Sequence, residues 1–279
     1  MASDPTAKWI LITGASSGIG LCAARELRAR GYRVIATARK LDDVDSLGAQ
    51  GFNAVRLDLS DSASIRAAVA AVVEQTEGHL YALFNNAGFG QIGPLEDLSR
   101  AALRAQFEVN LFGIHEITAL ILPLMRAQGY GRIIQTSSLL GLIALRYRGA
   151  YNASKYALEA WSDTLRLELS GTGIHVVLIE PGPITSRFRE NAYARYRQRI
   201  AEEASPHGSN YDAAEDRLRN ENAAGRFTLP PEAVVKKLIK ALESAHPRPR
   251  YFVTLPTYVF AFLKRLLPDR ALDALLVRL

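Results

Sequence analysis

The sequence predicts an α/β fold, a parallel sheet whose strands are joined by helices, and three observations support this prediction. Short apolar runs alternate with helical stretches along the 279 residues, which is typical of right-handed crossovers between parallel strands. A glycine-rich turn joins the first apolar run to the first helical stretch. Apolar residues make up 48% of the chain and no Ser/Gly/Pro-rich linker divides it, so we expect one domain over residues 1–279.

The elements follow in order along the chain. Strands are predicted near 8–13, 33–38, 53–57, 80–85, 131–137, 174–180 and 250–254. Helices are predicted near 18–30, 62–76, 97–127, 149–170, 231–245 and 256–278. Pro123 is expected to bend or end the long fourth helix locally, because proline cannot donate a helical hydrogen bond. The polar stretch 186–228 interrupts this alternation, and such an insertion is usually a lid over a site or a disordered loop.

The turn after the first strand has a composition suited to binding phosphate. Its sequence is Gly14-Ala15-Ser16-Ser17-Gly18-Ile19-Gly20. Glycines allow a tight turn and let backbone N–H groups approach a pyrophosphate, and the following helix N-terminus favours the anion. The spacing is G-x-x-x-G-x-G rather than the commoner G-x-G-x-x-G. Taken alone, the turn leaves a chance glycine-rich segment as the alternative, but with the helix described next it predicts a dinucleotide site.

The helix predicted over 149–170 carries Tyr151 and, four residues later, Lys155, while Ser138 lies thirteen residues before the tyrosine. Positions i and i+4 share a helix face, so we expect the phenol and the ammonium side by side. A neighbouring cation favours the phenolate, so we expect the pKa of Tyr151 to fall from ~10 toward neutrality. Such a group can donate or accept the proton that interconverts a carbonyl and an alcohol.

These features, together with others, resemble the short-chain dehydrogenase/reductase family from about Lys8 to Tyr251. The motifs are, in order, TGASSGIG at 13–20, NNAG at 85–88, Asn110, Ser138, Tyr151-x-x-x-Lys155 and Pro181-Gly182. The chain is most similar to bacterial NADP-dependent aldehyde reductases related to hydroxysteroid dehydrogenases, through GRIIQTSS, GAYNASKYALEAWSD, IEPGPI, RFTLPPEAV and LKRLLP. The resemblance implies a single doubly wound Rossmann-type domain, with a seven-stranded parallel sheet and helices on both faces.

The resemblance also implies a catalytic group. Tyr151 would be the general acid in reduction and the base in oxidation, with Lys155 lowering its pKa and binding the nicotinamide ribose. Ser138 would donate a hydrogen bond to the substrate oxygen. Asn110 would hold a water that links Lys155 to solvent. Ser137 is a rival for the serine role, but the thirteen-residue interval to the tyrosine favours Ser138.

The predicted cofactor contacts run along the strand ends, and most follow from the resemblance. They are Gly14, Ser16, Ser17, Gly18, Ile19, Gly20, Arg39, Asp58, Leu59, Asn86, Ala87, Gly88, Tyr151, Lys155, Pro181, Gly182, Ile184 and Ser186. For Asp58 the alternative is a helix N-cap, a role that Ser60 or Asp61 fits better. Ser186 stands where the family usually has threonine, so a hydroxyl is kept for the carboxamide of the nicotinamide.

The end of the second predicted strand favours NADP(H). NAD-dependent enzymes place an acidic residue there to bond the adenine ribose, but here Ala38 fills that position and Arg39 follows. Arginine binds a phosphate in bidentate fashion, whereas a carboxylate would repel it. The alternative is that Arg39 is ordinary charged surface and that Asp42 or Asp43 reaches back to the ribose.

Apolar residues near the reacting group predict a lipophilic substrate. They are Phe89, the run Leu139–Leu145 and Tyr147, and we expect about half of them to serve only core packing. The family's substrate loop occupies the position of 186–228, which favours a lid there. The leading function is NADPH-dependent reduction of lipophilic aldehydes or ketones. The alternatives are an NADP-linked hydroxysteroid or hydroxyacyl dehydrogenase working in oxidation, and a non-catalytic NADP(H) sensor, for which a proton donor would be superfluous.

Composition argues against several other classes of protein. The net charge is +6, but basic residues are interleaved with acidic ones, so we do not expect nucleic-acid binding. One cysteine excludes an internal disulfide, and the five histidines are scattered without ligand spacing, so we expect a reducing compartment and no metal. The first residues do not resemble a signal peptide and no apolar run reaches transmembrane length. We therefore expect a cytoplasmic protein.

Two further expectations concern partners. The segment 256–279 mixes apolar and basic residues, and it could close the pocket, pack at a subunit interface or lie on a membrane surface; docking on its own domain is slightly favoured. The family often pairs through the helices predicted at 97–127 and 149–170, where Ala153, Ala157 and Ala160 would permit close approach. A homo-oligomer is therefore expected.

Overall fold

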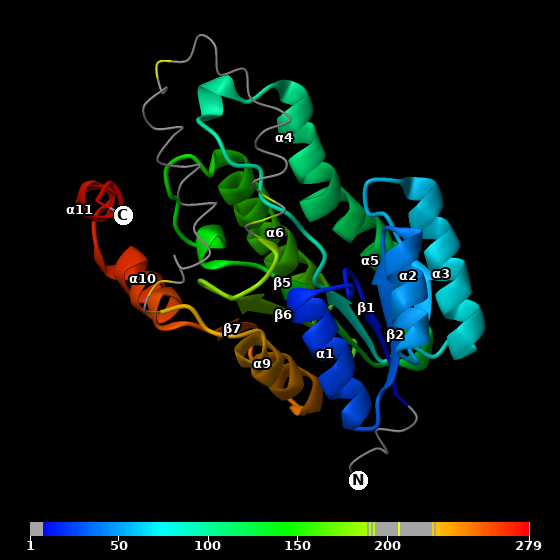
Figure 1. Cartoon of the computed structure of the whole chain (residues 1–279). Helices are drawn as coiled ribbons and strands as arrows, with labels where there is room; N and C mark the ends of the chain where they lie inside the picture. Colours follow the sequence, from blue (N-terminus) through cyan, green and yellow to red (C-terminus); the bar gives the residue numbers. More distant parts are fainter. Residues whose placement is uncertain are drawn as a thin grey trace.

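The structure is a computed structural model that describes residues 8–188, 190, 192, 206, 225 and 227–278. At its centre is a seven-stranded sheet with the order β3-β2-β1-β4-β5-β6-β7 (Figure 1). Every neighbouring pair of strands is parallel, which confirms the predicted fold class. The strands are β1 (Trp9–Ile12), β2 (Arg33–Ala38), β3 (Asn53–Arg56), β4 (Ala82–Asn85), β5 (Gly131–Thr136), β6 (Ile174–Glu180) and β7 (Arg250–Phe252).

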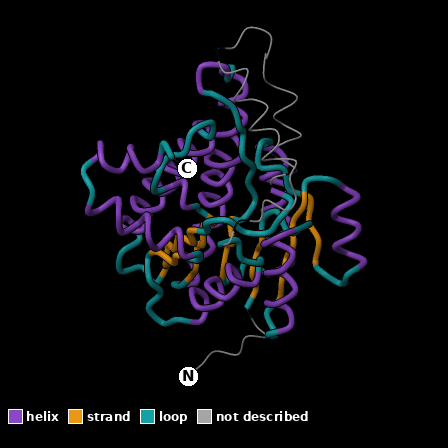
Figure 2. The backbone as a smooth tube through the Cα atoms, turned by 60° about the vertical axis from the view of Figure 1, so that its left-hand side comes forward, coloured by secondary structure: helices purple, strands orange, loops and turns teal. Residues whose placement is uncertain are grey.

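Helices cover both faces of this sheet (Figure 2). Successive side chains of a strand point to opposite faces, and β1 illustrates the result: Ile10 and Ile12 enter one core cluster and Leu11 the other. The first cluster includes side chains of α1 and α9, and the second those of α3, α5 and α6. The helices in these layers are α1 (Gly18–Ala29), α2 (Leu41–Ala49), α3 (Ser62–Thr76), α4 (Arg100–Phe107), α5 (Gly113–Gln128), α6 (Gly149–Glu168) and α9 (Glu232–Glu243).

Helix α2 was absent from the sequence prediction. It buries one side chain, Leu47, and its first turn carries Asp42 and Asp43. With so little apolar surface, the segment lacks the periodicity that marks a core-facing helix. The acidic first turn nevertheless suits a helix N-terminus, whose exposed N–H groups favour negative charge.

The long helix predicted over 97–127 is divided. A π-helical turn, Glu108–Phe112, joins α4 to α5, and Ser99 caps α4 by accepting a hydrogen bond from the Ala102 N–H. Pro123 lies inside α5 without ending it. The single helix predicted over 256–278 is likewise two, α10 (Leu255–Leu266) and α11 (Asp269–Leu276), with Pro268 as the N-cap of the second.

The expectation that no apolar run reaches transmembrane length needs correction. The continuous helical stretch Arg100–Gln128 has 29 residues and a window of mean hydropathy 1.3, enough to cross a membrane by length and composition alone. The apolarity has another source in this fold, because Ile114, Ile117, Ile121 and Met125 of α5 lie in the core beneath the sheet. The core helix of an α/β domain passes the same test.

Candidate active site

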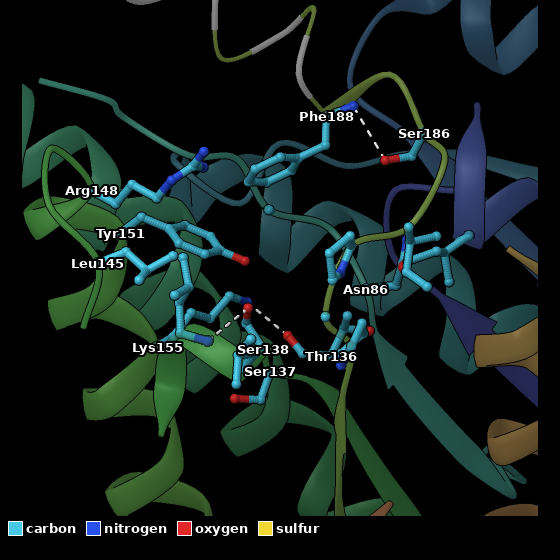
Figure 3. A pocket seen from close by; sticks show the side chains of 18 residues that line it. Asn86, Thr136, Ser137, Ser138, Leu145, Arg148, Tyr151, Lys155, Ser186 and Phe188 are labelled. Atoms are coloured by element: carbon cyan, nitrogen blue, oxygen red, sulfur yellow. Dashed lines mark hydrogen bonds between the residues drawn. The ribbon is translucent and has the colours of Figure 1, made fainter. Parts of the chain in front are cut away.

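The strand order reverses between β1 and β4, and residues that follow β4, β5 and β6 line one cavity of about 280 Å³ together with Ile19 of α1. Such a crevice is the usual ligand site of a doubly wound sheet. Figure 3 shows the cavity from close by. The predicted site residues that line it are Ile19, Asn86, Gly88, Ser138, Tyr151, Lys155, Pro181, Gly182, Ile184 and Ser186.

The glycine-rich turn is packed too tightly for side chains. Gly14 has φ +67, and a Cβ built on it would lie 2.9 Å from the Ala87 Cα. A Cβ on Gly20 would lie 2.2 Å from the Gly14 carbonyl oxygen. Ser17 is the N-cap of α1, with extended backbone and no side-chain cap bond, so the first N–H groups of the helix keep their capacity to bind an anion. Ser16, Ser17 and Gly18 are half-buried, and the turn therefore fits a pyrophosphate.

The loop after β4 is fastened to this turn. The hydroxyl oxygen of Thr13 accepts hydrogen bonds from the backbone N–H groups of Asn86 and Ala87 at 2.9 and 3.0 Å. The Asn86 carboxamide donates to the carbonyls of Thr13 and Gly14, both at 3.1 Å. The amide of Asn86 is thus fixed against the glycine-rich turn. A contact between Asn86 and the cofactor remains a prediction.

Three catalytic candidates come together from two elements. Tyr151 and Lys155 lie on the first two turns of α6, and Ser138 lies between β5 and the short 3₁₀ turn Leu139–Gly141. The Ser138 side chain lies near the Tyr151 phenol and acts on its pKa as a hydrogen-bonding group, whereas the hydroxyl of Ser137 lies near the carboxyl of Glu159. The geometry therefore favours Ser138 over its rival.

The pKa values of this group do not follow the simple expectation. Burial raises the pKa of Tyr151 to about 12, against the hydrogen bond from Ser138 and the charge of Arg148, which lower it. Burial lowers the pKa of Lys155 to about 8. The Lys155 ammonium donates to the Thr136 carbonyl at 2.7 Å and lies 5.7 Å from the centroid of the Tyr151 ring. The prediction of a lowered tyrosine pKa is thus wrong, because removal from water outweighs the nearby cation.

Asn110 is fully buried in the π-helical turn and stands behind the cavity rather than in its wall. Its carboxamide oxygen accepts from the Phe89 N–H at 3.2 Å, and its amide donates to the Phe89 carbonyl at 3.0 Å and to the Ser154 hydroxyl at 3.2 Å. The side chain therefore braces the loop after β4 against α6. The water-holding role remains a prediction.

The ends of β2 and β3 form the side of the site that would receive the adenosine half of a dinucleotide. Ala38 is buried and Arg39 is exposed. Arg56, which is in register with Ala38 on β3, donates from its guanidinium to the Arg39 carbonyl at 3.4 Å. Two guanidinium groups therefore lie at this edge, where the sequence predicted one. Register across parallel strands was the signal that could have revealed Arg56.

Asp58 and Leu59 have local structural partners. The Asp58 carboxylate accepts from the Ser60 N–H at 3.0 Å and from the Ser60 hydroxyl at 2.7 Å. The N-cap of α3 is Asp61, which accepts from the Ala63 N–H, so the alternative of a capping role for Asp58 is wrong. Leu59 is buried in the core beneath α5, and a Cβ on Gly113 would lie 2.0 Å from its carbonyl oxygen.

The segment after β6 forms the opposite wall. The Pro181 carbonyl accepts from the Leu139 N–H at 2.8 Å. A Cβ on Gly182 would lie 2.1 Å from the Thr254 hydroxyl, which explains the glycine. Ser186, and not its neighbour Thr185, lines the cavity. Most of the lid predicted over 186–228 lies outside the described residues.

Comparison with known proteins bears on this geometry. A model of the short chain dehydrogenase family matches residues 8–197. The chain belongs to that family. Over 269 residues this short-chain dehydrogenase is 48% identical to the "Uncharacterized oxidoreductase YbbO" of Escherichia coli (strain K12), covering 96% of the chain and 94% of that protein. It is 32% identical to the "NADPH-dependent 3-dehydrocapnine reductase" of Ornithobacterium rhinotracheale, with 95% of each covered.

Solved structures agree with this assignment. A short chain dehydrogenase/reductase from Burkholderia phymatum in complex with NAD superposes with a TM-score of 0.80 at 28% identity and covers 95% of each chain. The protein is therefore an oxidoreductase whose family binds a nicotinamide cofactor. Which nicotinamide cofactor it takes depends on its own residues.

A buried charge cluster behind the candidate serine, Ser138, of this short-chain dehydrogenase was not predicted. Glu180, the last residue of β6, is fully buried, and Glu159 lies one helical turn beyond Lys155 on α6. Arg250 of β7 contacts Glu159 at 3.0 Å, Asp163 at 2.6 Å and Glu180 at 3.1 Å. Burial and the charge of Glu159 raise the pKa of Glu180. One guanidinium thus balances carboxylates from two other elements.

The predicted apolar wall is only partly in the cavity. Leu139, Leu140 and Leu145 line it, whereas Phe89, Gly141, Leu142, Ile143, Ala144 and Tyr147 do not. Two side chains that the sequence did not single out, Arg148 and Phe188, complete the lining (Figure 3). Phe188 comes after the last family motif in the sequence and belongs to none of them. No sequence pattern therefore indicated that it lines the cavity.

Proposed function

We propose that this protein is an NADPH-dependent reductase of lipophilic aldehydes or ketones. The observation that carries the proposal is the meeting of Tyr151 and Ser138 in a cavity that Leu139, Leu140 and Phe188 make apolar. A carbonyl substrate needs one acidic donor and one hydrogen-bond donor at its oxygen. Apolar side chains around that point favour the hydrocarbon part of a substrate over a sugar.

The protonation states favour reduction. When bound, the dihydronicotinamide supplies a hydride to the carbonyl carbon. Because the pKa of Tyr151 is about 12, the phenol keeps its proton at neutral pH and can donate it to the developing alkoxide. Ser138 donates a second hydrogen bond to the same oxygen. The Lys155 ammonium, held on the Thr136 carbonyl at 2.7 Å, stabilises the phenolate that forms, since charges interact strongly in a buried site.

Preference for the phosphorylated cofactor follows from the edge formed by β2 and β3. Ala38 offers no carboxylate to a ribose diol, and Arg39 and Arg56, which meet at the ends of β2 and β3, would attract a 2′-phosphate. The printed name of the Ornithobacterium relative includes NADPH, which agrees. Asp42 and Asp43 stand in the first turn of α2 and remain the residues through which NADH would be accepted.

We also propose a homo-oligomer that pairs through α5 and α6. Phe112 and Leu120 are exposed large apolar residues on or beside α5, and Ala153 and Ala160 lie exposed along α6. Small residues on one helix and large ones on the other permit close packing between subunits.

Turnover of purified protein tests the proposed function. NADPH oxidation with medium-chain aldehydes is expected to be fast, and NADP⁺ reduction with steroid alcohols slower. Tyr151→Phe should lower kcat by about 10²–10⁴-fold while NADPH binding changes little. Tyr156→Phe is the matched control, because this tyrosine lies on the same helix and donates to the Leu142 carbonyl outside the cavity. Full activity of Tyr151→Phe would refute the assignment, and NADPH binding without turnover of any carbonyl would favour the sensor.

A further inference from the structure

The outward face of α10 is apolar along its whole length. Leu255, Tyr258, Val259, Phe262 and Leu266 are between 43% and 64% exposed. Their spacing places all five on one side of the helix, opposite Thr257 and Ala261, which are buried. We call these five residues the α10 stripe. A contiguous exposed stripe of large apolar side chains marks an interaction surface more often than ordinary solvent-facing surface.

The charged residues within α10 are basic. The helix carries Lys264 and Arg265 in its last turn and no acidic residue, and the next acidic residue is Asp269 at the start of α11. On the other flank, the Lys237 ammonium of α9 lies 3.2 Å from the Tyr258 hydroxyl. A second copy docking on this face by two-fold symmetry would bring like charges together. An anionic surface would instead be attracted to them.

The inner side of the same helix pair forms part of the cavity wall. Phe260 of α10 and Leu276 of α11 pack on the buried cluster of Leu139, Leu140 and Ile143, of which the two leucines line the cavity. Lys264 donates to the Leu142 carbonyl, and Arg146 donates to the Val277 carbonyl at 2.7 Å. Figure 1 shows α10 and α11 at the edge of the molecule. Helix α10 thus carries the stripe on its outer side and packs on the residues that line the cavity with its inner side.

We propose that the α10 stripe docks on an anionic phospholipid bilayer, so that a lipophilic substrate reaches the cavity directly from the membrane. The apolar face would lie among the acyl chains near the headgroups, with Arg265 and Lys237 at the level of the phosphates, as in helices that lie in a membrane interface. The docking itself does not depend on catalysis. Delivery of the substrate rests on the proposed function.

Co-flotation of the full-length protein with vesicles of phosphatidylcholine and phosphatidylglycerol tests the docking. Wild type should float with these vesicles, less with pure phosphatidylcholine, and less at high salt. The double variant Phe262→Glu/Leu266→Glu should lower the vesicle-bound fraction by about tenfold or more, because two apolar side chains that would lie among the acyl chains become charged. Leu41→Glu/Leu95→Glu is the matched control, since both leucines are equally exposed on other elements, and it should bind as wild type does.

Three outcomes would overturn the proposal: no flotation of wild type, equal loss in both double variants, or a change from dimer to monomer in Phe262→Glu/Leu266→Glu on size-exclusion chromatography. The last would show that a second copy covers the stripe. Circular dichroism excludes unfolding of the variants. Turnover of a short water-soluble aldehyde distinguishes failure of the docking proposal from failure of the proposed function. If docking is right but the function is wrong, wild type floats with the vesicles and reduces no aldehyde. If both are right, Phe262→Glu/Leu266→Glu keeps its turnover of the short aldehyde and loses only activity on a long-chain aldehyde carried in vesicles.

Discussion

The ring of Phe188 lies edge-on to the ring of Tyr151, with the two centroids 5.3 Å apart and the planes at 63°. The same phenylalanine lies over Gly90, where a Cβ would come within 2.8 Å of its ring. Both rings line the cavity (Figure 3). The phenol of Tyr151, the candidate proton donor, thus lies between its own helix and an aromatic side chain from the segment after β6.

Phe188→Ala should weaken binding of lipophilic substrates. The change removes apolar surface from the cavity wall, so KM for a long-chain aldehyde is expected to rise by about tenfold, with a smaller change in kcat. Steady-state kinetics with a long-chain and a short-chain aldehyde provide the measurement and its internal control. A rise in KM that is equal for both substrates would show that Phe188 positions Tyr151 and does not contact the hydrocarbon chain.

Arg39→Ala should discriminate between the two nicotinamide cofactors. Loss of a charge-assisted phosphate contact is expected to weaken NADPH binding by about 10–100-fold and to leave NADH nearly unchanged. Arg39→Asp should go further and favour NADH. Lys40→Ala, beside it in sequence and also exposed, is the control. Fluorescence titration with each cofactor measures the dissociation constants, and parallel losses for both cofactors would contradict a phosphate-binding role.

The lowered pKa of Lys155 predicts a rise in stability with pH. Its pKa is about 8 in the folded protein, against 10.5 as an unperturbed side chain, so between these values the unfolded chain binds more protons. The free energy of unfolding should therefore increase from pH ~8 to ~10 by about 1–3 kcal/mol relative to Lys155→Met. Below pH ~8 both states are charged and the difference should be constant. Urea unfolding of both proteins at several pH values gives the comparison, and parallel curves throughout would contradict the buried ammonium.

Arg250→Ala should be severely destabilising. It leaves Glu159 and Glu180 buried without their counter-ion, for which a loss of about 3–5 kcal/mol is expected. Arg30→Ala is a useful contrast, because the Arg30–Glu243 pair at 3.4 Å has side chains that are about half exposed, and its loss should cost less than ~1 kcal/mol.

The deficit of Arg250→Ala should also depend on pH. Burial raises the pKa of both glutamates, so the folded variant holds their protons to higher pH than the unfolded chain does. Its stability relative to wild type should therefore be greatest below the unfolded carboxyl pKa of ~4.3 and decline as the pH rises toward the raised folded values. Urea unfolding at acid and neutral pH tests this, and a deficit that does not change with pH would show that the carboxyls are ionised in the variant.

The fold was largely accessible from the sequence because its central strands are buried on both faces. Runs such as Ile10–Ile12 are continuously apolar, the glycine-rich turn directly follows a predicted strand, and Tyr151 and Lys155 lie at the start of a predicted helix. Helix α2 could not be found in this way, since it contributes only Leu47 to the core. Pro123 does not end α5. The interruption in the predicted helix is the π-helical turn Glu108–Phe112, which the pattern of apolar residues does not mark.

The site was predictable only where its parts are close in sequence. Ser138, which the sequence favours over Ser137, is the serine that acts on the pKa of Tyr151, and its role in catalysis stays a prediction. The direction in which the pKa of Tyr151 is shifted was predicted wrongly. Helical spacing reveals a neighbouring charge, but it does not reveal how deeply both groups are buried. Phe188, Arg56 and Arg250 reach the site through tertiary packing and strand register, which a linear pattern does not contain.

The position of Arg250 near the end of the chain affects when, during synthesis, the active site can be completed. Every predicted catalytic and cofactor-binding residue lies at or before Ser186, yet the guanidinium that balances Glu159 and Glu180 comes from the final strand, and Thr254 lies against Gly182 just beyond it. A growing or prematurely terminated polypeptide therefore carries all the chemical groups for catalysis before it can hold them in place. We therefore expect a chain that ends before β7 to lack the Arg250 counter-ion of Glu159 and Glu180 and to be inactive.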